Sequence, residues 1–195
     1  AYGAEPVRYF LLRQIAVNQD GEFSTGDLEH RIETDLANDL GNLLQRMTAL
    51  AQKYDVLEIQ APKIWSKQSL NLRDESWNTI EDFKSYMQDY MFHLALARLW
   101  QFIKQVNGYF HRQEPWKLAT KDKAQFMEVL AATCHSLRVI ALLLWPVMPN
   151  KMEQLLASLG TAFKLENNTI KNLDLGAWNK RFMVKKIPPL FTKPI

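Results

Sequence analysis

The sequence predicts an all-α protein, a helical bundle over most of its length. Three observations favour this fold: apolar residues recur at three- and four-residue steps, capping residues precede these stretches, and proline or glycine follows them. With 47% hydrophobic residues in a chain of 195, one core can form without cross-links. The helical pattern covers residues 24–160. Residues 1–23 form a short separate piece, and residues 161–195 an irregular tail that we expect to pack back on the bundle.

The first long helix is predicted to run from Ser24 to about Tyr54. Ser24 stands three residues before Asp27, an acidic variant of the capping box that opens helices. Apolar residues define the buried face of this helix: Leu28, Ile32, Leu36, Leu40, Leu43, Leu44, Met47 and Leu50. Asn42 and Arg46 lie beside that face. Their four-residue spacing points both side chains out of one side of the helix, one turn apart.

Weaker signals surround the start of this helix. Residues 7–13 are apolar and aromatic, but they are too few to separate a strand from a buried helical turn. Residues 18–22 contain Asp-Gly and are typical of a turn. Asp35 and Asp39 lie four residues apart within the predicted helix, a spacing of acids that is typical of an ordinary charged surface.

A second long helix is predicted to begin at Thr79, which has Asp82 three residues on. It should run for about thirty residues at 1.5 Å each. Residues 56–78 before it contain Pro62, several polar residues and no sustained period, which indicates a connecting segment. The buried face of the second helix is formed by Phe83, Met87, Tyr90, Leu94, Ala97, Ile103, Val106 and Phe110.

Pro115 ends this second helix, since proline disfavours the helical conformation in the residue before it and fits the first turn of a new helix. Trp116 therefore lies at a helix junction. Together with Asn42 and Arg46 it supplies what the reading of an unstacked nucleotide requires: an amide and a guanidinium for the base edge, and an aromatic ring for its face. Taken alone, these residues are more typical of a buried tryptophan and a surface polar pair.

The last helices of the predicted bundle follow this junction. One begins at Asp122 and ends before Pro146 and Pro149. Its buried side is formed by Phe126, Val129, Leu130, Thr133, Leu137, Ile140, Ala141 and Leu144. A shorter helix over residues 151–159 ends at Gly160, the usual residue for a left-handed C-terminal cap. Beyond it, Asn167-Asn168, Gly176 and residues 188–191 indicate extended pieces that wrap over the bundle.

The net charge of +3 is far weaker than that of a protein that coats DNA, so any contact with nucleic acid must be local. We expect phosphate contacts from the basic residues that surround the Pro115 junction: Arg112, Lys117, Lys121 and Lys123, with Lys53 and His111 nearby. Considered separately, scattered lysines are more typical of a solvated surface.

The single cysteine, Cys134, excludes an internal disulfide and a multi-cysteine zinc site. A reducing compartment is compatible with it, and we expect a cytoplasmic protein. The longest apolar run, residues 139–145, is far shorter than the roughly 20 residues of a membrane span, so we expect no membrane partner. Residues 1–8 lack the features of a signal peptide and begin without methionine, which indicates a piece of a longer protein.

Catalytic residues are not predicted in this chain. Cys134 and His135 are adjacent on an apolar helix, where neighbouring side chains point about 100° apart and cannot easily form a nucleophile and base pair. The histidines are too dispersed along the chain to predict a metal site: His30, His93, His111 and His135. No glycine-rich phosphate loop occurs. We therefore expect neither a metal nor a cofactor in this chain.

Several separated segments match one family in the right order: residues 2–13, 19–24, 35–46, 115–118, 137–149 and 188–191. On these segments the chain resembles the C-terminal half of the methionyl-tRNA synthetases, a class I synthetase family. The resemblance covers nearly the whole chain. It implies that residues up to about 23 end a stem-contact region, and that the rest forms an α-helical anticodon-binding domain.

The resemblance also implies roles for single residues. Trp116 corresponds to a tryptophan that stacks on an anticodon base, and Pro115 to the proline that holds it. Asn42 and Arg46 correspond to residues that hydrogen-bond the anticodon, with the cytosine at its first position as their main target. His111 is expected at the same anticodon-binding site, at a position where some members of the family carry an acid.

Members of this family join methionine to its tRNA using ATP and magnesium. The resemblance therefore implies a methionine–tRNA ligase as the parent, with tRNA(Met) and the catalytic domain of the same protein as partners. The catalytic His-Ile-Gly-His and Lys-Met-Ser-Lys-Ser signatures are not in this chain, so we expect it to be inactive alone. Two alternatives stay open: the anticodon domain of the isoleucine, leucine or valine enzyme, and a helical interaction module without an RNA role.

Overall fold

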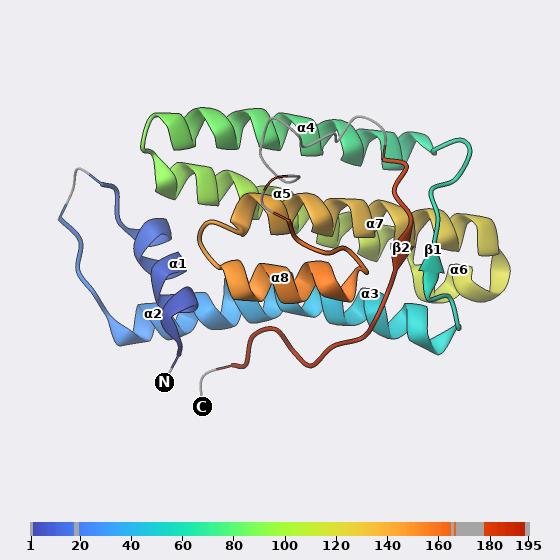
Figure 1. Cartoon of the computed structure of the whole chain (residues 1–195), viewed down its shortest axis with the longest axis horizontal. Coiled ribbons are helices and arrows are strands. Elements are labelled where there is room, and N and C mark those ends of the chain that lie inside the picture. Colours follow the sequence, from blue (N-terminus) through green and yellow to red (C-terminus); the bar gives the residue numbers. More distant parts are fainter. Residues whose placement is uncertain (1, 18–19, 165, 167–177, 194–195) are drawn as a thin grey trace.

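A computed structural model of the chain describes residues 2–17, 20–164, 166 and 178–193. Its helices form an elongated bundle with one short β-ribbon, which confirms the predicted all-α fold (Figure 1). The helices are α1 Ala4–Gln14, α2 Thr25–Arg31, the π-helical η1 Ile32–Gly41, α3 Asn42–Lys53, α4 Lys67–Gln88, α5 Phe92–Gln113, α6 Pro115–Lys121, α7 Lys123–Leu144 and α8 Pro149–Ser158. The strands are β1 Glu58–Ile59 and β2 Phe182–Met183, which pair antiparallel.

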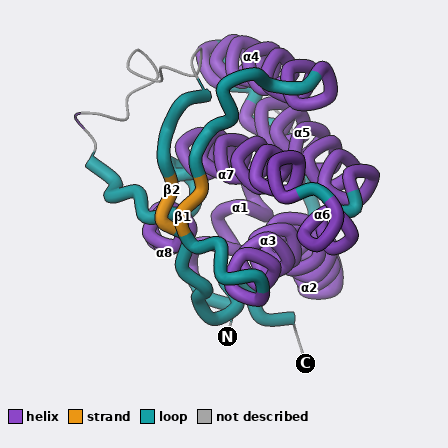
Figure 2. Tube along the Cα trace, turned by 90° about the vertical axis from the view of Figure 1, so that its right-hand side faces the viewer, coloured by secondary structure: helices purple, strands orange, loops and turns teal. Residues whose placement is uncertain are grey.

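Helix α7 is the centre of the bundle. Every residue from Val129 to Leu144 is buried, including polar ones such as Thr133 and Ser136. A helix that is buried on every side must be covered on every side. Helices α3, α4, α5, α6 and α8 and strand β1 all contact α7 (Figure 2). Among the described residues α7 is also the one helix long and apolar enough to cross a membrane. However, 89% of its most apolar 18-residue window is buried within the protein.

The first predicted helix forms within its expected limits. The Ser24 hydroxyl accepts a hydrogen bond from the Asp27 amide at 3.3 Å, which confirms Ser24 as the N-cap, and the helix ends at Tyr54. Elements α2, η1 and α3 continue one another through helical backbone angles. The sequence pattern did not indicate that η1 is wound as a π-helix.

The second predicted helix is wrong at its start and in its middle. The chain becomes helical at Lys67, where the Ser66 hydroxyl accepts a hydrogen bond from the Ser69 amide at 3.4 Å, so Thr79 lies inside α4. Residues 67–78 are therefore helix and not a connecting segment. At residues 89–91 the chain reverses, with Tyr90 in the left-handed region at φ 58°.

The reversal makes α4 and α5 a hairpin of packed helices (Figure 1). Tyr90 and Leu94 at this turn are 70% and 38% exposed, although they were expected on a buried face. The apolar period runs on across the turn because both helices bury a stripe against the same core. A periodic pattern reports which face is buried and not the direction of the chain.

Residues 7–13, which the pattern left ambiguous, belong to helix α1, and its Tyr9 and Phe10 side chains are buried. The Glu5 carboxylate of α1 accepts hydrogen bonds from the amides of Asn150 and Lys151 at 2.7 and 3.1 Å. It thus satisfies two of the unpaired N–H groups at the start of α8. Helix α8 itself begins two residues earlier than expected, with Pro149 at its first position.

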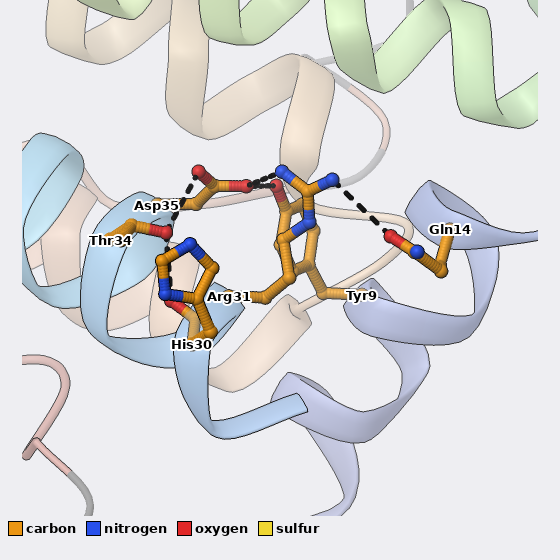
Figure 3. A network of polar contacts seen from close by, with 6 residues as sticks. All are labelled: Tyr9, Gln14, His30, Arg31, Thr34 and Asp35. Atoms are coloured by element: carbon orange, nitrogen blue, oxygen red, sulfur yellow. Dashed lines mark hydrogen bonds and ion pairs between the residues drawn. The ribbon is translucent and has the colours of Figure 1, made fainter. Parts of the chain in front are cut away.

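A buried network joins α1 to η1, as Figure 3 shows. The Tyr9 hydroxyl donates to Asp35 Oδ2 at 2.7 Å, and the Arg31 guanidinium approaches the same oxygen at 3.2 Å and Gln14 Oε1 at 3.2 Å. Asp35 is 5% exposed, so the expectation that it lies on an ordinary charged surface is wrong. Burial, and after it the nearby Asp35 carboxylate, raises the pKa of Tyr9 well above its usual value, which keeps the hydroxyl a donor.

The described part of the tail packs on the bundle in extended conformation. It buries Trp178, Phe182, Val184, Leu190 and Phe191. Its backbone amides at positions 184 and 185 donate to the carbonyls of residues 57 and 158, each at 2.7 Å. Gly160 caps α8 at φ 71°, as predicted. The expectations for residues 18–19, Asn167-Asn168 and Gly176 lie outside the described residues, and the division into three domains stays a prediction.

Replacing Asp35 by alanine should lower the free energy of unfolding by about 1–3 kcal/mol, because the buried Tyr9 hydroxyl loses its acceptor. Urea denaturation followed by circular dichroism measures this change. Glu33→Ala is the matched control: it breaks only the exposed Glu33–Lys193 ion pair and should cost less than about 1 kcal/mol. Equal effects of the two substitutions would contradict a structural role for the network.

Candidate nucleic-acid interface

Two segments distant in sequence meet at the surface beside α6. The Arg46 guanidinium carbon on α3 lies 5.9 Å from the centre of the Trp116 ring on α6. It also lies 5.3 Å from the ring of Phe110 on α5, a buried residue. Both distances are within the range of a cation–π contact. The structure therefore brings together Arg46 and Trp116, the pair for which the resemblance implies a shared site.

The junction between α5 and α6 holds the backbone of Trp116 in place. Glu114 ends α5 in the left-handed conformation, at φ 45° and ψ 55°, and the buried Pro115 begins α6. The Tyr54 hydroxyl donates to the Trp116 carbonyl at 3.4 Å, and the Tyr54 ring packs edge-on against Phe126 at 5.6 Å. The indole itself is only partly buried. Trp116 is thus fixed by its main chain while part of its ring stays accessible.

His111 borders this surface, and Asn42 lies one turn from Arg46. The exposed His111 ring lies 5.9 Å from the Trp116 ring, tilted by 45°. Asn42 is exposed one turn before Arg46 on the same helix, so both side chains leave the same side of α3. Imidazole, indole and guanidinium groups therefore lie on one surface formed by three helices, and the Asn42 amide leaves α3 one turn before the guanidinium.

Asn107 received no role from the sequence but positions these elements. Its side-chain amide donates to the Asp39 carbonyl at 3.0 Å and to the Ile103 carbonyl at 3.1 Å. The first bond ties α5 to the helix just before Asn42. The sequence signal was an asparagine inside an apolar helical pattern, where this residue type is a poor helix former. The structure adds that the side chain is partly buried and therefore needs partners.

The basic residues do not all lie at this surface. Lys117 is exposed and pairs with Glu114 at 2.6 Å. Lys121 and Lys123, where α6 meets α7, are exposed and form no ion pair among the described residues. Arg112 lies instead beside α4, where it lines a hollow together with residues of that helix. Its Nη1 atom lies close to Gly108: a Cβ atom added to Gly108 would be 2.9 Å from it. Phosphate contacts by these residues stay predictions.

This arrangement suits an unstacked base better than a duplex. A partly exposed indole offers a stacking face, and a guanidinium beside it offers five N–H donors that reach the edge of a base. Stacking works on any base, whereas hydrogen bonds to its edge distinguish one base from another.

Comparisons with known proteins point the same way. Residues 1–48 match the family model described as tRNA synthetases class I (M), and residues 71–182 match the anticodon-binding domain of tRNA ligase. The chain is 36% identical to the methionine–tRNA ligase of Lactococcus lactis over 98% of its own length, and 36% identical to that of Thermotoga maritima over 78%. It spans 29% and 24% of those two proteins.

Solved structures agree with these sequence relatives. The apo form of Mycobacterium tuberculosis methionyl-tRNA synthetase superposes with a TM-score of 0.90 at 31% identity, covering 100% of this chain and 40% of that one. The same enzyme bound by methionyl-adenylate gives a TM-score of 0.88 at 30% identity, covering 98% of this chain and 38% of that one. The bundle described above is thus similar in fold to a part of that enzyme.

The Cys134–His135 pair lies away from this surface, inside α7. Cys134 is fully buried against Met47, and burial raises the pKa of its thiol. The His135 ring stacks on Trp178 with centres 5.3 Å apart, and burial, followed by the charges of Arg138 and Lys180, lowers its pKa to about 3. A protonated thiol and a histidine that binds protons so weakly cannot act together as nucleophile and base at neutral pH. The described residues contain no cluster of three metal-binding side chains.

Cys134 should resist a thiol reagent such as dithionitrobenzoate while the protein is folded, because the side chain is inaccessible and its thiolate is disfavoured. Absorbance should report the thiol only after denaturant is added, at one per chain. Rapid stoichiometric labelling of the folded protein would show that α7 is open to solvent at Cys134.

Proposed function

Because the chain belongs to the family of anticodon-binding domains of tRNA ligases, we propose that it reads the anticodon of tRNA(Met) within a methionine–tRNA ligase. One observation carries the assignment to particular residues: the Arg46 guanidinium lies 5.9 Å from the partly exposed ring of Trp116. The methionine–tRNA ligases among its relatives support the choice of amino acid and tRNA.

In this proposal Trp116 stacks on one unpaired anticodon base while Arg46 and Asn42 hydrogen-bond its edge. The target is the cytosine at the first anticodon position. A guanidinium can only donate hydrogen bonds, so Arg46 would donate to the oxygen and nitrogen acceptors on the pairing edge of cytosine. The Asn42 amide offers an acceptor as well as a donor, and its oxygen serves the exocyclic amino group of the base.

The remaining predicted residues act around this base. Pro115 sets the start of α6 and so the place of the indole, and the His111 ring extends the aromatic surface beside it. Lys117 and Lys121 are exposed on α6, and Lys123 is exposed at the start of α7, where they would attract phosphates. These contacts position the RNA without reading its sequence.

The activity of the parent protein forms part of the proposal. The chain spans less than a third of its curated relatives, so the ATP- and magnesium-dependent joining of methionine to tRNA would be carried out by a catalytic domain of the same protein. The chain alone should bind tRNA without charging it. We propose a cytoplasmic location, where the other components of translation reside, and no membrane partner.

Replacing Trp116 by alanine should weaken binding of tRNA(Met) by about 1–3 kcal/mol, the usual contribution of one base stacked on an aromatic ring. Fluorescence anisotropy of labelled tRNA measures the dissociation constant. Trp77→Ala is the control, since it removes another partly exposed indole from α4, away from the proposed site. Unchanged binding by Trp116→Ala would exclude the stacking role, and so would an equal loss in the control.

Replacing Arg46 by alanine should reduce discrimination between anticodons as well as affinity. Wild-type protein should prefer tRNA(Met) over a variant with another base at the first anticodon position by about 1–3 kcal/mol, and Arg46→Ala should lose most of that preference. Arg73→Ala, which removes a partly exposed guanidinium from α4, should keep it. Equal affinity of the wild-type protein for both tRNAs would overturn the proposal. A preference for an isoleucine, leucine or valine tRNA would instead favour the anticodon domain of that enzyme.

A further inference from the structure

A hollow lies between α4 and the last turns of α5, with a volume of about 320 Å³. Most side chains around it are polar: Gln68, Asn71, Gln105, Tyr109, Arg112 and Gln113. Binding pockets for small ligands start near this size. The hollow is therefore large enough for one nucleobase and differs from the Arg46–Trp116 surface in its residues.

The amide groups around this hollow are available to a ligand. Gln68, Asn71 and Gln105 are exposed, and none of them forms a side-chain hydrogen bond within the described part of the chain. Each amide carries both a donor and an acceptor, the combination that matches the edge of a base. A carboxylate, Glu75, also lines the hollow and pairs with Arg98 at 2.8 Å. Its negative charge makes the wall less suited to a phosphate than to an uncharged base.

Arg112 contributes a guanidinium to the wall of the hollow, and Tyr109 contributes a buried hydroxyl. The Arg112 guanidinium lies along α5 over Gly108, where a side chain would displace it. The plane of a guanidinium at the wall of a hollow can stack on a base. The Tyr109 hydroxyl is within 2.9 Å of the Ser69 hydroxyl, and burial raises the pKa of Tyr109 to about 12, so the floor of the hollow stays uncharged.

The hollow and the proposed anticodon site meet at the last turn of α5. His111 borders Trp116, and the next residue, Arg112, lines the hollow. Consecutive residues of a helix point about 100° apart, so a single RNA strand that crosses the end of α5 can reach both places. The crossing is limited to the 10–12 Å width of a helix.

We propose that this hollow binds a second unstacked nucleotide of the anticodon loop through its base. The base would lie against the Arg112 guanidinium, with its edge hydrogen-bonded by Asn71 and Gln105. The inference rests on the proposed anticodon-reading function and adds a second contact that the Arg46–Trp116 surface does not supply.

The test compares two double variants in the binding of a fluorescent RNA hairpin that carries the tRNA(Met) anticodon loop. Asn71→Ala with Gln105→Ala removes the two amides and should weaken binding about tenfold, the effect of two lost hydrogen bonds of ordinary strength. Asn78→Ala with Gln101→Ala removes the same residue types from exposed positions on the same two helices, outside the hollow, and should leave binding unchanged.

Hairpins with an abasic nucleotide at each loop position in turn identify the bound base. At one loop position, different from that of the base assigned to Trp116, removing the base should weaken binding of the hairpin to wild-type protein. The same removal should not weaken binding further in the Asn71/Gln105 variant, which has already lost the contact to that base. This second binding site is excluded if the Asn71/Gln105 variant binds the hairpin like wild-type protein. It is also excluded if the loss of affinity from the abasic nucleotide and the loss from the double substitution add at every loop position. If Trp116→Ala still weakens binding in that case, the anticodon proposal stands without it. If no hairpin binds the wild-type protein, both proposals fall.

Discussion

The burial of α7 on all sides is the constraint on which the rest of this structure depends. From Val129 to Leu144 the helix offers no face to solvent, so every side needs an apolar partner. Helices α3, α4, α5, α6 and α8 meet that need, and the β1–β2 ribbon covers the remaining side (Figure 2). Because α3, α5 and α6 all pack on or beside α7, their surfaces meet, and Arg46, His111 and Trp116 become neighbours.

The two ends of the bundle have different features. Helix α1 lies at one end of the long axis and α6 at the other (Figure 1). The Tyr9–Asp35–Arg31 network ties α1 to η1, and one continuous helix leads from there to Arg46. This continuous helix therefore connects the α1 end of the bundle with the Arg46–Trp116 surface. Its stiffness comes from backbone hydrogen bonds along its length and from the buried stripe that packs it on the core.

The candidate site was only partly open to prediction. Pro115 and Trp116 at a helix junction follow from proline chemistry, and the four-residue spacing of Asn42 and Arg46 places them on one side of a helix. The closeness of Arg46 to Trp116 was expected only through the family resemblance, because spacing within a helix says nothing of a contact across seventy residues. Asn107 and the hollow between α4 and α5 were not predicted, since both arise from the way separate helices pack.

The sequence by itself determined the all-α class, the limits of the first helix, the caps at Ser24 and Asp122, and the stop at Gly160. These features depend on neighbours a few residues apart, within the reach of local hydrogen bonds and helical periodicity. Tertiary structure alone decided the reversal at Tyr90, the burial of Asp35 and the meeting of Arg46 with Trp116. Each of these depends on what packs against a residue from far along the chain, and a stripe of apolar side chains does not specify its partner.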